Sequence, residues 1–345
     1  MSKPIKKSSI VTLEDVALAV GMSISTVSRT FTPGASVGKH AKAKILRAAA
    51  ELGYRPNAIA RTLSTRQSRI IALVVSYLHN QFYPLVIEQI SKLLQHDGFH
   101  VLLFVNEEGA NHETQTDDLL LQILSYQVDG IILASSPISS KLAKQCVDNN
   151  TPVVMFNRIS KLQGVGTVES DNYAGGQLAA QALLRSGAKR MGFIAGLETA
   201  STSIERQRGF VDALKAAGHS LFAQAVGHYD QHKVAAAARQ MFSEKANMPD
   251  AVFIANDHMA FAVLDVLRNE LGLSVPRDVQ VIGFDNVPQA AWGAYELTTI
   301  EQNAEQMSQA TVSMLLAQIH AKEQLKPLHV VIPTRLIHRK TTRNS

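Results

Sequence analysis

The stretch TLEDVALAVGMSISTVSRTF at residues 12–31 contains two short helix patterns separated by a glycine. Thr12 is a good N-cap with Asp15 three residues further on, and the apolar residues that follow recur at helical spacing. Gly21 ends this helix, and Ser23 caps the next one. Two helices joined by a three-residue turn that begins with glycine are typical of a helix-turn-helix.

A third helix pattern follows this pair and supplies the rest of a small core. Ile45, Ala49 and Leu52 recur on one face, and Gly53 ends the helix. In the helix-turn-helix class, the second helix lies in the major groove of DNA with its N-terminal residues against base edges. The beginning of the chain therefore predicts an all-α DNA-binding headpiece.

The charge distribution supports this prediction. Residues 1–70 contain twelve Lys or Arg and three acidic residues, a charge of +9 that leaves −4 for the rest of a chain whose total is +5. A basic head on a mildly acidic body suits a polyanionic partner for the head alone. A solubilising basic tail is the alternative explanation of the charge.

From Ile70 onward, short apolar runs alternate with helical stretches, as in βαβ units. Apolar strands joined by helices imply parallel sheets that are covered on both faces. The segment is long for one sheet, so we expect an α/β body of two doubly wound subdomains with a cleft between them. Ligands in such folds bind beyond the carboxyl ends of the strands. We expect these strands at 70–75, 100–105, 130–134, 152–156, 190–195, 250–255, 279–284 and 330–333.

Several protein classes are not indicated by the sequence. No apolar run is as long as a membrane span, and the basic N-terminus lacks the apolar stretch of a secretory signal, so we expect a cytoplasmic protein that associates with the nucleoid when bound to DNA. The single cysteine, Cys146, excludes an intramolecular disulfide. Neither a P-loop, a G-x-S-x-G motif nor metal-ligand spacing occurs, so we expect no enzyme activity, cofactor or metal.

Seven motifs are spread in a fixed order along nearly the whole chain. Besides residues 12–31, they are AAAELGYRPNAIARTLSTRQS (48–68), DNYAGG (171–176), ERQRGF (205–210), ANDHMA (255–260), VPRDVQVIGFDN (275–286) and LTTI (297–300). In these motifs the sequence resembles the lactose-repressor/galactose-repressor family of bacterial transcriptional regulators. The resemblance implies a DNA-binding headpiece, a hinge helix, two subdomains like those of periplasmic binding proteins, and a homodimer.

On this basis we expect a helix-turn-helix domain at 1–56, a hinge helix or linker at 57–69, and an effector-binding and dimerisation domain at 70–345. The first subdomain of that body would comprise about 70–168 and 300–327, and the second about 169–299 and 328–345.

The resemblance places the base-reading residues on the second helix, where Ile24, Ser25 and Arg29 would select bases. Arg29 can donate two hydrogen bonds to guanine, and Ile24 can contact a thymine methyl. Phosphate contacts, which orient the protein without specifying sequence, are expected from Thr12, Thr26, Ser28, Lys39 and Lys42. The third helix departs from the family, because it opens with VGKHAKAKI (37–45) where relatives place a Ser or Thr cap and a Thr-Arg pair.

The linker after Pro56 has reasonable helix propensity but is too short to be helical alone in water. The resemblance implies that Asn57, Ala60 and Leu63 form a hinge helix that folds on DNA beside its dimer mate. Leu63 would wedge into a base step of the minor groove, and the small Ala60 would allow close approach. A plain flexible tether is the alternative.

Effector-binding residues are expected at strand ends and at the start of the following helices, and the resemblance selects among them. They are Phe82, Tyr83, Asn157, Arg158, Arg206, Tyr229, Asn256 and Asp285. Amide, carboxylate and guanidinium groups facing aromatic rings suit a sugar. Three alternatives stay open. Phe82 is equally consistent with a core position, and Arg206 and Asp285 with a structural ion pair. Arg206 is also a suitable partner for an anionic ligand.

The sequence therefore predicts an effector-responsive repressor of carbohydrate-utilisation genes that binds pseudo-palindromic operator DNA as a homodimer and takes a sugar or sugar acid in its cleft. The alternatives are a solute-binding protein of the same cleft fold and a regulator with a purine-type co-repressor. Induction and co-repression both remain open.

Replacing Arg29 by alanine tests the base-reading role. We expect a binding-site selection to show relaxed preference at one base pair, with about 1–3 kcal/mol of discrimination lost there. Uniformly weaker binding with an unchanged preferred sequence would instead make Arg29 a phosphate contact.

Overall fold

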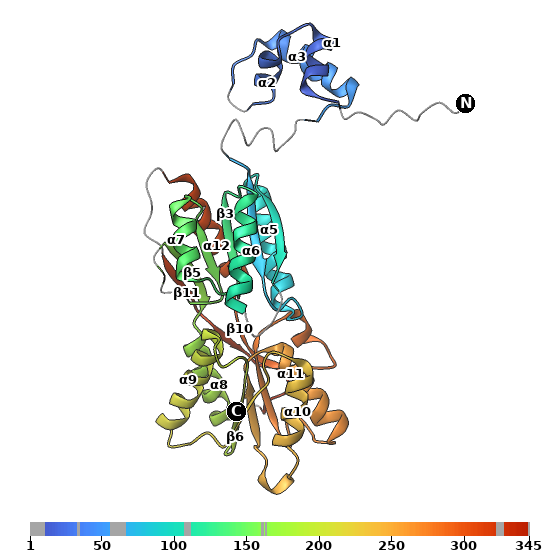
Figure 1. Cartoon of the computed structure of the whole chain (residues 1–345). Coiled ribbons are helices and arrows are strands. Elements are labelled where there is room, and N and C mark those ends of the chain that lie inside the picture. The colour runs from blue at the N-terminus through green and yellow to red at the C-terminus, as the bar shows by residue number, and fades with distance from the viewer. Residues whose placement is uncertain are drawn as a thin grey trace, which may run out of the picture. The chain divides into compact units, whose positions relative to one another are not determined.

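The computed structural model describes residues 11–32, 35–55, 67–106, 112–159, 162, 164–321 and 328–343. The chain divides into two compact units, a head of residues 1–68 and a body of residues 69–345 (Figure 1). No helix among the described residues is long and apolar enough to cross a membrane.

Three helices form the head: α1 (Leu13–Val20), α2 (Ile24–Thr30) and α3 (Lys39–Leu52). Thr12 and Asp15 form the capping box of α1, because each side chain bonds the backbone N–H of the other. The core consists of Val16, Ala17, Val20, Val27, Ile45 and Ala49. Leu52, which we expected on the same face as Ile45 and Ala49, lies at the last position of α3 and is 40% exposed.

The first sheet of the body has six parallel strands in the order β11-β5-β4-β3-β1-β2. Side chains of β1 alternate between its two faces: Ile71 and Leu73 pack in the core that includes α5 and α12, whereas Ala72 and Val74 pack with α6 and α7. The sheet is thus covered on both sides, as predicted. Its strands are β1 (Ile70–Val75), β2 (His100–Val105), β3 (Gly130–Ala134), β4 (Val153–Phe156), β5 (Val165–Ser170) and β11 (His329–Ile332), and its helices are α5 (Phe82–His96), α6 (His112–Ser125), α7 (Ser140–Asp148) and α12 (Ala304–His320).

The second sheet has the order β12-β10-β9-β8-β6-β7, and all its neighbours are parallel except β10 and β12. Its strands are β6 (Met191–Ala195), β7 (Ala223–Val226), β8 (Ala251–Ile254), β9 (Gln280–Asp285), β10 (Thr298–Glu301) and β12 (Arg335–Ile337). Its helices are α8 (Asn172–Arg185), α9 (Ser201–Ala216), α10 (Gln231–Met241) and α11 (Asp257–Asp265), the last continued by a π-helical turn over Val266–Glu270.

The predicted subdomain limits are wrong at the crossovers. We assigned residues 328–345 to the second subdomain, but β11 pairs with β5 in the first sheet, from His329 against Thr167 to Ile332 against Ser170. The first sheet also keeps β5 as far as Ser170, beyond the predicted limit at 168. The chain therefore passes between the two sheets after β5, after β10 and again between β11 and β12. Strand β5 carries Thr, Glu and Ser among its residues, which hid it from an apolar pattern.

Helices α8 and α9 approach closely through two glycines. A Cβ on Gly176 would lie 2.1 Å from the carbonyl oxygen of Arg206, and one on Gly209 would lie 2.0 Å from that of Tyr173. Real Cβ atoms do not approach backbone oxygens so closely, so the two helices can sit at this distance only with glycine at both positions. This contact fixes where α9 places Arg206.

Gly176→Ala is expected to destabilise the body although alanine is the better helix former by about 1 kcal/mol. The Cβ would push α9 away from α8, at a cost of about 1–3 kcal/mol beyond the propensity gain. Urea unfolding followed by circular dichroism measures the change. Gly293→Ala is the control, because a Cβ there meets nothing within 4 Å; equal effects of the two substitutions would contradict the prediction.

Candidate functional site

The outer face of α2 presents the residues that were predicted to read bases. Ile24, Ser25 and Arg29 are exposed, with Ile24 at 48%, while Val27 is buried in the head core. Ser23 caps the helix, since its hydroxyl accepts from the Thr26 N–H. A rigid, capped helix with these three side chains free has the geometry that major-groove recognition needs.

The predicted phosphate contacts fall into two groups. Ser28, Lys39 and Lys42 are exposed, and Lys39 and Lys42 lie in the first turn of α3. The hydroxyls of Thr12 and Thr26 are engaged inside the head: Thr12 donates to Asp15 Oδ2 over 2.8 Å, and Thr26 shares a 2.9 Å hydrogen bond with Ser23. Contact of these two hydroxyls with phosphate would compete with those bonds.

The hinge residues Asn57, Ala60 and Leu63 lie outside the described residues. Their role in the minor groove stays a prediction.

A pocket of about 310 Å³, partly open to solvent, lies between the two sheets of the body. The first half contributes Tyr77, Asn80, Tyr83, Ser135 and Asn157, and the second contributes Thr202, Arg206, Tyr229, Asn256 and Asp285. Ser135, Asn157 and Asn256 directly follow or closely follow the carboxyl ends of β3, β4 and β8, as expected for a ligand site in this fold.

Backbone strain is concentrated around this pocket. Five of its ten lining residues have positive φ although none is glycine: Tyr77, Ser135, Asn157, Tyr229 and Asp285. Such conformations cost on the order of 1 kcal/mol or more each and cluster at functional sites. The strained turns aim polar side chains into the space between the halves.

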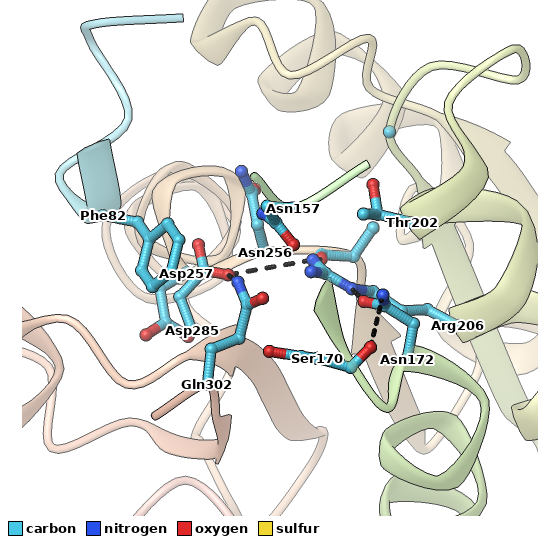
Figure 2. Close-up of polar contacts among 12 residues, drawn as sticks. Phe82, Asn157, Ser170, Asn172, Thr202, Arg206, Asn256, Asp257, Asp285 and Gln302 are labelled. Atoms are coloured by element: carbon cyan, nitrogen blue, oxygen red, sulfur yellow. Dashed lines mark hydrogen bonds and ion pairs between the residues drawn. The ribbon is translucent and has the colours of Figure 1, made fainter. Parts of the chain in front are cut away.

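Arg206 and Asp285 face each other across the pocket floor (Figure 2). Arg206 Nη1 lies 3.8 Å from Asp285 Oδ1, and both side chains are almost completely buried. The Arg206 guanidinium also donates to Asn172 Oδ1 over 2.8 Å and to the Ala255 carbonyl oxygen over 2.6 Å, and it lies 3.6 Å above the centre of the Phe284 ring. These contacts hold a buried cation that would otherwise be strongly unfavourable.

The environment of Asp285 opposes its ionisation. Burial raises the pKa of Asp285 to about 7, even though Arg206 and a 2.6 Å hydrogen bond from Gln302 Nε2 both favour the carboxylate. The nearby carboxyl of Asp257 adds to the rise in the pKa. A ligand that donates a hydrogen bond to Asp285 would favour its ionised form.

Asp257 holds the turn that carries Asp285. It is completely buried at the start of α11 and accepts hydrogen bonds from Thr299 Oγ1 over 2.6 Å and from the Val287 N–H over 3.1 Å. Burial raises the pKa of Asp257 to about 6. Because its oxygens are used by this turn, Asp257 supports the pocket and does not line it.

Two buried amide atoms in the pocket lining have no hydrogen-bond partner among the described residues. They are Asn157 Oδ1, an acceptor, and Asn256 Nδ2, a donor. The other amide atom of each is used: Asn157 Nδ2 donates to the Tyr83 hydroxyl over 3.4 Å, and Asn256 Oδ1 accepts from the Met259 N–H over 3.0 Å. An unsatisfied buried polar group is costly, so these atoms point to a hydrogen-bonding ligand.

Tyrosines provide the apolar part of the pocket. The rings of Tyr77 and Tyr229, from opposite halves, meet edge to face with centroids 5.8 Å apart. Tyr83 is buried from solvent, and burial raises the pKa of its hydroxyl to about 12, so it remains a neutral hydrogen-bonding group.

Six of the eight predicted effector residues line the pocket, and two do not. Phe82 is buried beside the rings of Tyr83 and Phe156 and belongs to the core. Arg158 donates from Nη1 to the Ser135 carbonyl oxygen over 3.1 Å and so braces a strained turn. The prediction that these two residues line the pocket is wrong, because neighbouring groups already use their side chains.

Four lining residues were not predicted: Tyr77, Asn80, Ser135 and Thr202. Tyr77 and Ser135 come one or two residues after predicted strands, so the rule that ligands bind at carboxyl ends could have found them. Asn80 lies in the loop before α5, where the sequence carries no comparable signal, and Thr202 lies in the first turn of α9. Among the described residues, no group of three or more His, Cys, Asp or Glu side chains could hold a metal ion.

The head and the pocket together define a class of DNA-binding regulator with a ligand-binding body. Residues 12–57 match the family model "Bacterial regulatory proteins, lacI family", and residues 180–342 match that of a periplasmic binding protein-like domain. The ribose operon repressor of Bacillus subtilis is 32% identical over 335 residues, which cover 96% of this chain and 98% of the repressor. The chain belongs to the lacI family of bacterial regulatory proteins, whose members are DNA-binding transcriptional regulators and not enzymes.

Two solved structures are similar over nearly the whole chain. The transcriptional regulator CelR in complex with cellobiose is 30% identical with a TM-score of 0.71, covering 96% of this chain and 99% of CelR. The Lac repressor dimer bound to operator and an anti-inducer is 25% identical with a TM-score of 0.85, with the same two shares covered.

The raised pKa of Asp285 makes a pH-dependent prediction. The folded protein retains a proton on Asp285 up to about pH 7, whereas an unfolded chain releases it near pH 4, so the contribution of Asp285 to stability falls as the pH rises between these values. Asp285→Asn removes this loss. We expect the melting temperature of the variant, relative to wild type, to increase from about pH 4 to pH 7.

Thermal unfolding across this range measures the slope. Asp118→Asn, at an exposed position of α6, is the control and should give a constant difference from wild type. If both variants differed from wild type by a melting-temperature shift that does not change with pH, the raised pKa of Asp285 would be contradicted.

Proposed function

We propose that this protein represses transcription as a homodimer on pseudo-palindromic operator DNA, and that a neutral sugar in the pocket of the body controls its affinity for the operator. The observation that carries the proposal is the pocket itself. It combines a buried Arg206–Asp285 pair with one unsatisfied amide donor and one unsatisfied amide acceptor.

A polyhydroxylated ligand fits these groups. Each sugar hydroxyl both donates and accepts a hydrogen bond, so adjacent hydroxyls can satisfy Asn157 Oδ1 and Asn256 Nδ2 and can bridge Arg206 and Asp285. The tyrosines offer apolar surface for the ring carbons.

Charge favours a neutral sugar over a sugar acid. Of the ten lining residues, Arg206 carries a positive charge, and Asp285 cancels it when a ligand that donates a hydrogen bond favours the carboxylate. A ligand carboxylate would pair with Arg206 but would lie beside Asp285. A purine would need a flat slot, whereas Tyr77 and Tyr229 meet at an interplanar angle of 67°.

The surface of the first half supports a homodimer. β2 is an edge strand of its sheet, yet it exposes Leu103 at 46% and Val105 at 55%. Leu121 and Tyr126, in and just after α6, are exposed at 47% and 56%. An apolar edge of this kind is unfavourable in a monomer, and a second copy of the chain would cover it.

Polar contacts join the two halves of the body across the pocket. Asn80 Nδ2 lies 3.5 Å from Asp285 Oδ2, and His258 Nδ1 lies 3.3 Å from Gln81 Oε1. A ligand that bonds both halves would favour this arrangement over a more open one, and only such unequal binding can shift the equilibrium between states. We infer that the shift reaches operator DNA through the linker that follows the head.

A thermal-shift and calorimetry panel tests the ligand. It contains D-ribose, cellobiose, D-gluconate and hypoxanthine as probes for neutral sugars, a sugar acid and a purine. We expect one of the two neutral sugars to stabilise the body by about 2.7 kcal/mol at a hundred times its Kd. Arg206→Lys should abolish this gain, because lysine cannot reproduce the fixed guanidinium contacts.

Arg239→Lys is the matched control, because Arg239 pairs with Glu270 at the surface, away from the pocket lining. Gel shifts of genomic fragments with and without the active probe then give the sign of the response. Stabilisation by hypoxanthine or D-gluconate alone would overturn the neutral-sugar proposal, and failure to retard any fragment would favour a solute-binding protein.

A further inference from the structure

Behind Arg206, a row of polar contacts runs from the pocket to the protein surface. Arg206 Nε donates to Asn172 Oδ1 over 2.8 Å. Asn172 Nδ2 lies 3.5 Å from Glu169 Oε2, and the other oxygen of Glu169 lies 2.8 Å from His329 Nε2. Neither Asn172, Glu169 nor His329 lines the pocket, so all three act on a ligand only through Arg206.

The orientation of the Asn172 amide depends on its neighbours. Its Nδ2 donates to the Ser170 carbonyl oxygen over 2.9 Å and faces the Glu169 carboxylate, which turns Oδ1 toward Arg206 (Figure 2). A flipped amide would place N–H groups against the N–H of Arg206 and would lose an acceptor. The Ser170 carbonyl oxygen and the Glu169 carboxylate together therefore favour the amide orientation that holds the guanidinium.

The Glu169–His329 pair joins a buried group to a half-exposed one. The Glu169 side chain is 7% exposed and that of His329 is 51% exposed. Burial raises the pKa of Glu169, the contacts with His329 and Asn172 lower it, and Glu205 on α9 raises it. His329 lies on β11, Asn172 on α8 and Glu205 on α9. All three surround Glu169 at the end of β5, where the chain first passes from one half of the body to the other.

We propose that Glu169 and His329 are positioning residues for the effector site, and that the protonation of this pair tunes ligand affinity by controlling how firmly Asn172 holds Arg206. The second part of this inference rests on the proposed function. The first part, the orientation of Arg206, does not depend on the identity of any ligand.

The sign of the effect follows from the two protonation states. Glu169 holds the Asn172 amide best as a carboxylate, and His329 supports that carboxylate best as an imidazolium. Acidification protonates Glu169 above the usual range for a glutamate, because its pKa is raised. Affinity should therefore fall as acidification protonates Glu169, and it should be highest where Glu169 is a carboxylate.

Nuclear magnetic resonance of arginine-labelled full-length protein tests the positioning role without a ligand. The Arg206 Nε–H resonance, assigned by its loss in Arg206→Lys, should shift and exchange faster with water in Glu169→Gln and His329→Gln. Arg239 Nε–H, which bonds Glu270 over 2.6 Å elsewhere in the body, is an internal control and should not change. Glu270→Gln should give the reverse pattern.

Binding of the four probes from about pH 5 to pH 8.5 tests the tuning. For a probe that binds, Glu169→Gln should weaken affinity about fivefold at the pH of tightest binding, as expected for one lost hydrogen bond. It should also remove the part of the fall in affinity on acidification that Glu169 causes. His329→Gln should move the fall in affinity on acidification to higher pH, because His329 lowers the pKa of Glu169. Asp285 is present in wild type and in both variants, so the test rests on the differences between their profiles.

The outcomes separate the two proposals. If no probe binds the wild type, the proposed sugar site fails, while the Arg206 resonance still decides the positioning role. If Glu169→Gln does not fold, His329→Gln carries the test, since the exposed imidazole is the easier group to lose. An unchanged Arg206 resonance and parallel pH profiles in the folded variants would leave the pair as a contact between β5 and β11 only, and would overturn the inference.

Discussion

The buried guanidinium of Arg206 is the constraint on which the rest of the body depends. A cation at 2% exposure costs several kcal/mol unless its N–H groups and its charge are matched. Asn172, the Ala255 carbonyl oxygen, the Phe284 ring and Asp285 supply these partners from α8 and from the ends of β8 and β9. The glycine contact between α8 and α9 and the ends of two strands of the second sheet thus meet at one side chain.

The same region is poorly satisfied in the absence of a ligand. Strained backbone at five lining residues, two amide atoms without partners and a carboxyl group whose ionisation is opposed all lie around one small space. Each is unfavourable for folding alone, and a hydrogen-bonding ligand would satisfy the two amide atoms and favour the carboxylate. Because these groups lower the stability of the ligand-free pocket, a ligand that satisfies them can shift the equilibrium between arrangements of the two halves.

Sequence patterns predicted the elements whose residues form continuous apolar runs or local capping interactions. Strands such as β1 and β3 are unbroken apolar runs, and the cap of Thr12 with Asp15 is a local interaction, so both were predictable. The polar strand β5 and the short strands β7, β10 and β12 escaped, because their place in a sheet depends on partners far away in the chain. Glu169 in β5, for example, is paired with His329, 160 residues further on.

By itself, the sequence determined the helix-turn-helix, the two α/β halves, the family, and most of the polar residues of the pocket. Short-range periodicity, capping and motif order carry that information locally. Only the tertiary structure decided that β11 belongs to the first sheet, that Phe82 is core and Arg158 a brace, and that Tyr77, Asn80, Ser135 and Thr202 complete the pocket. The reason is physical: which polar atom is left free to meet a ligand depends on which neighbours have already used the others.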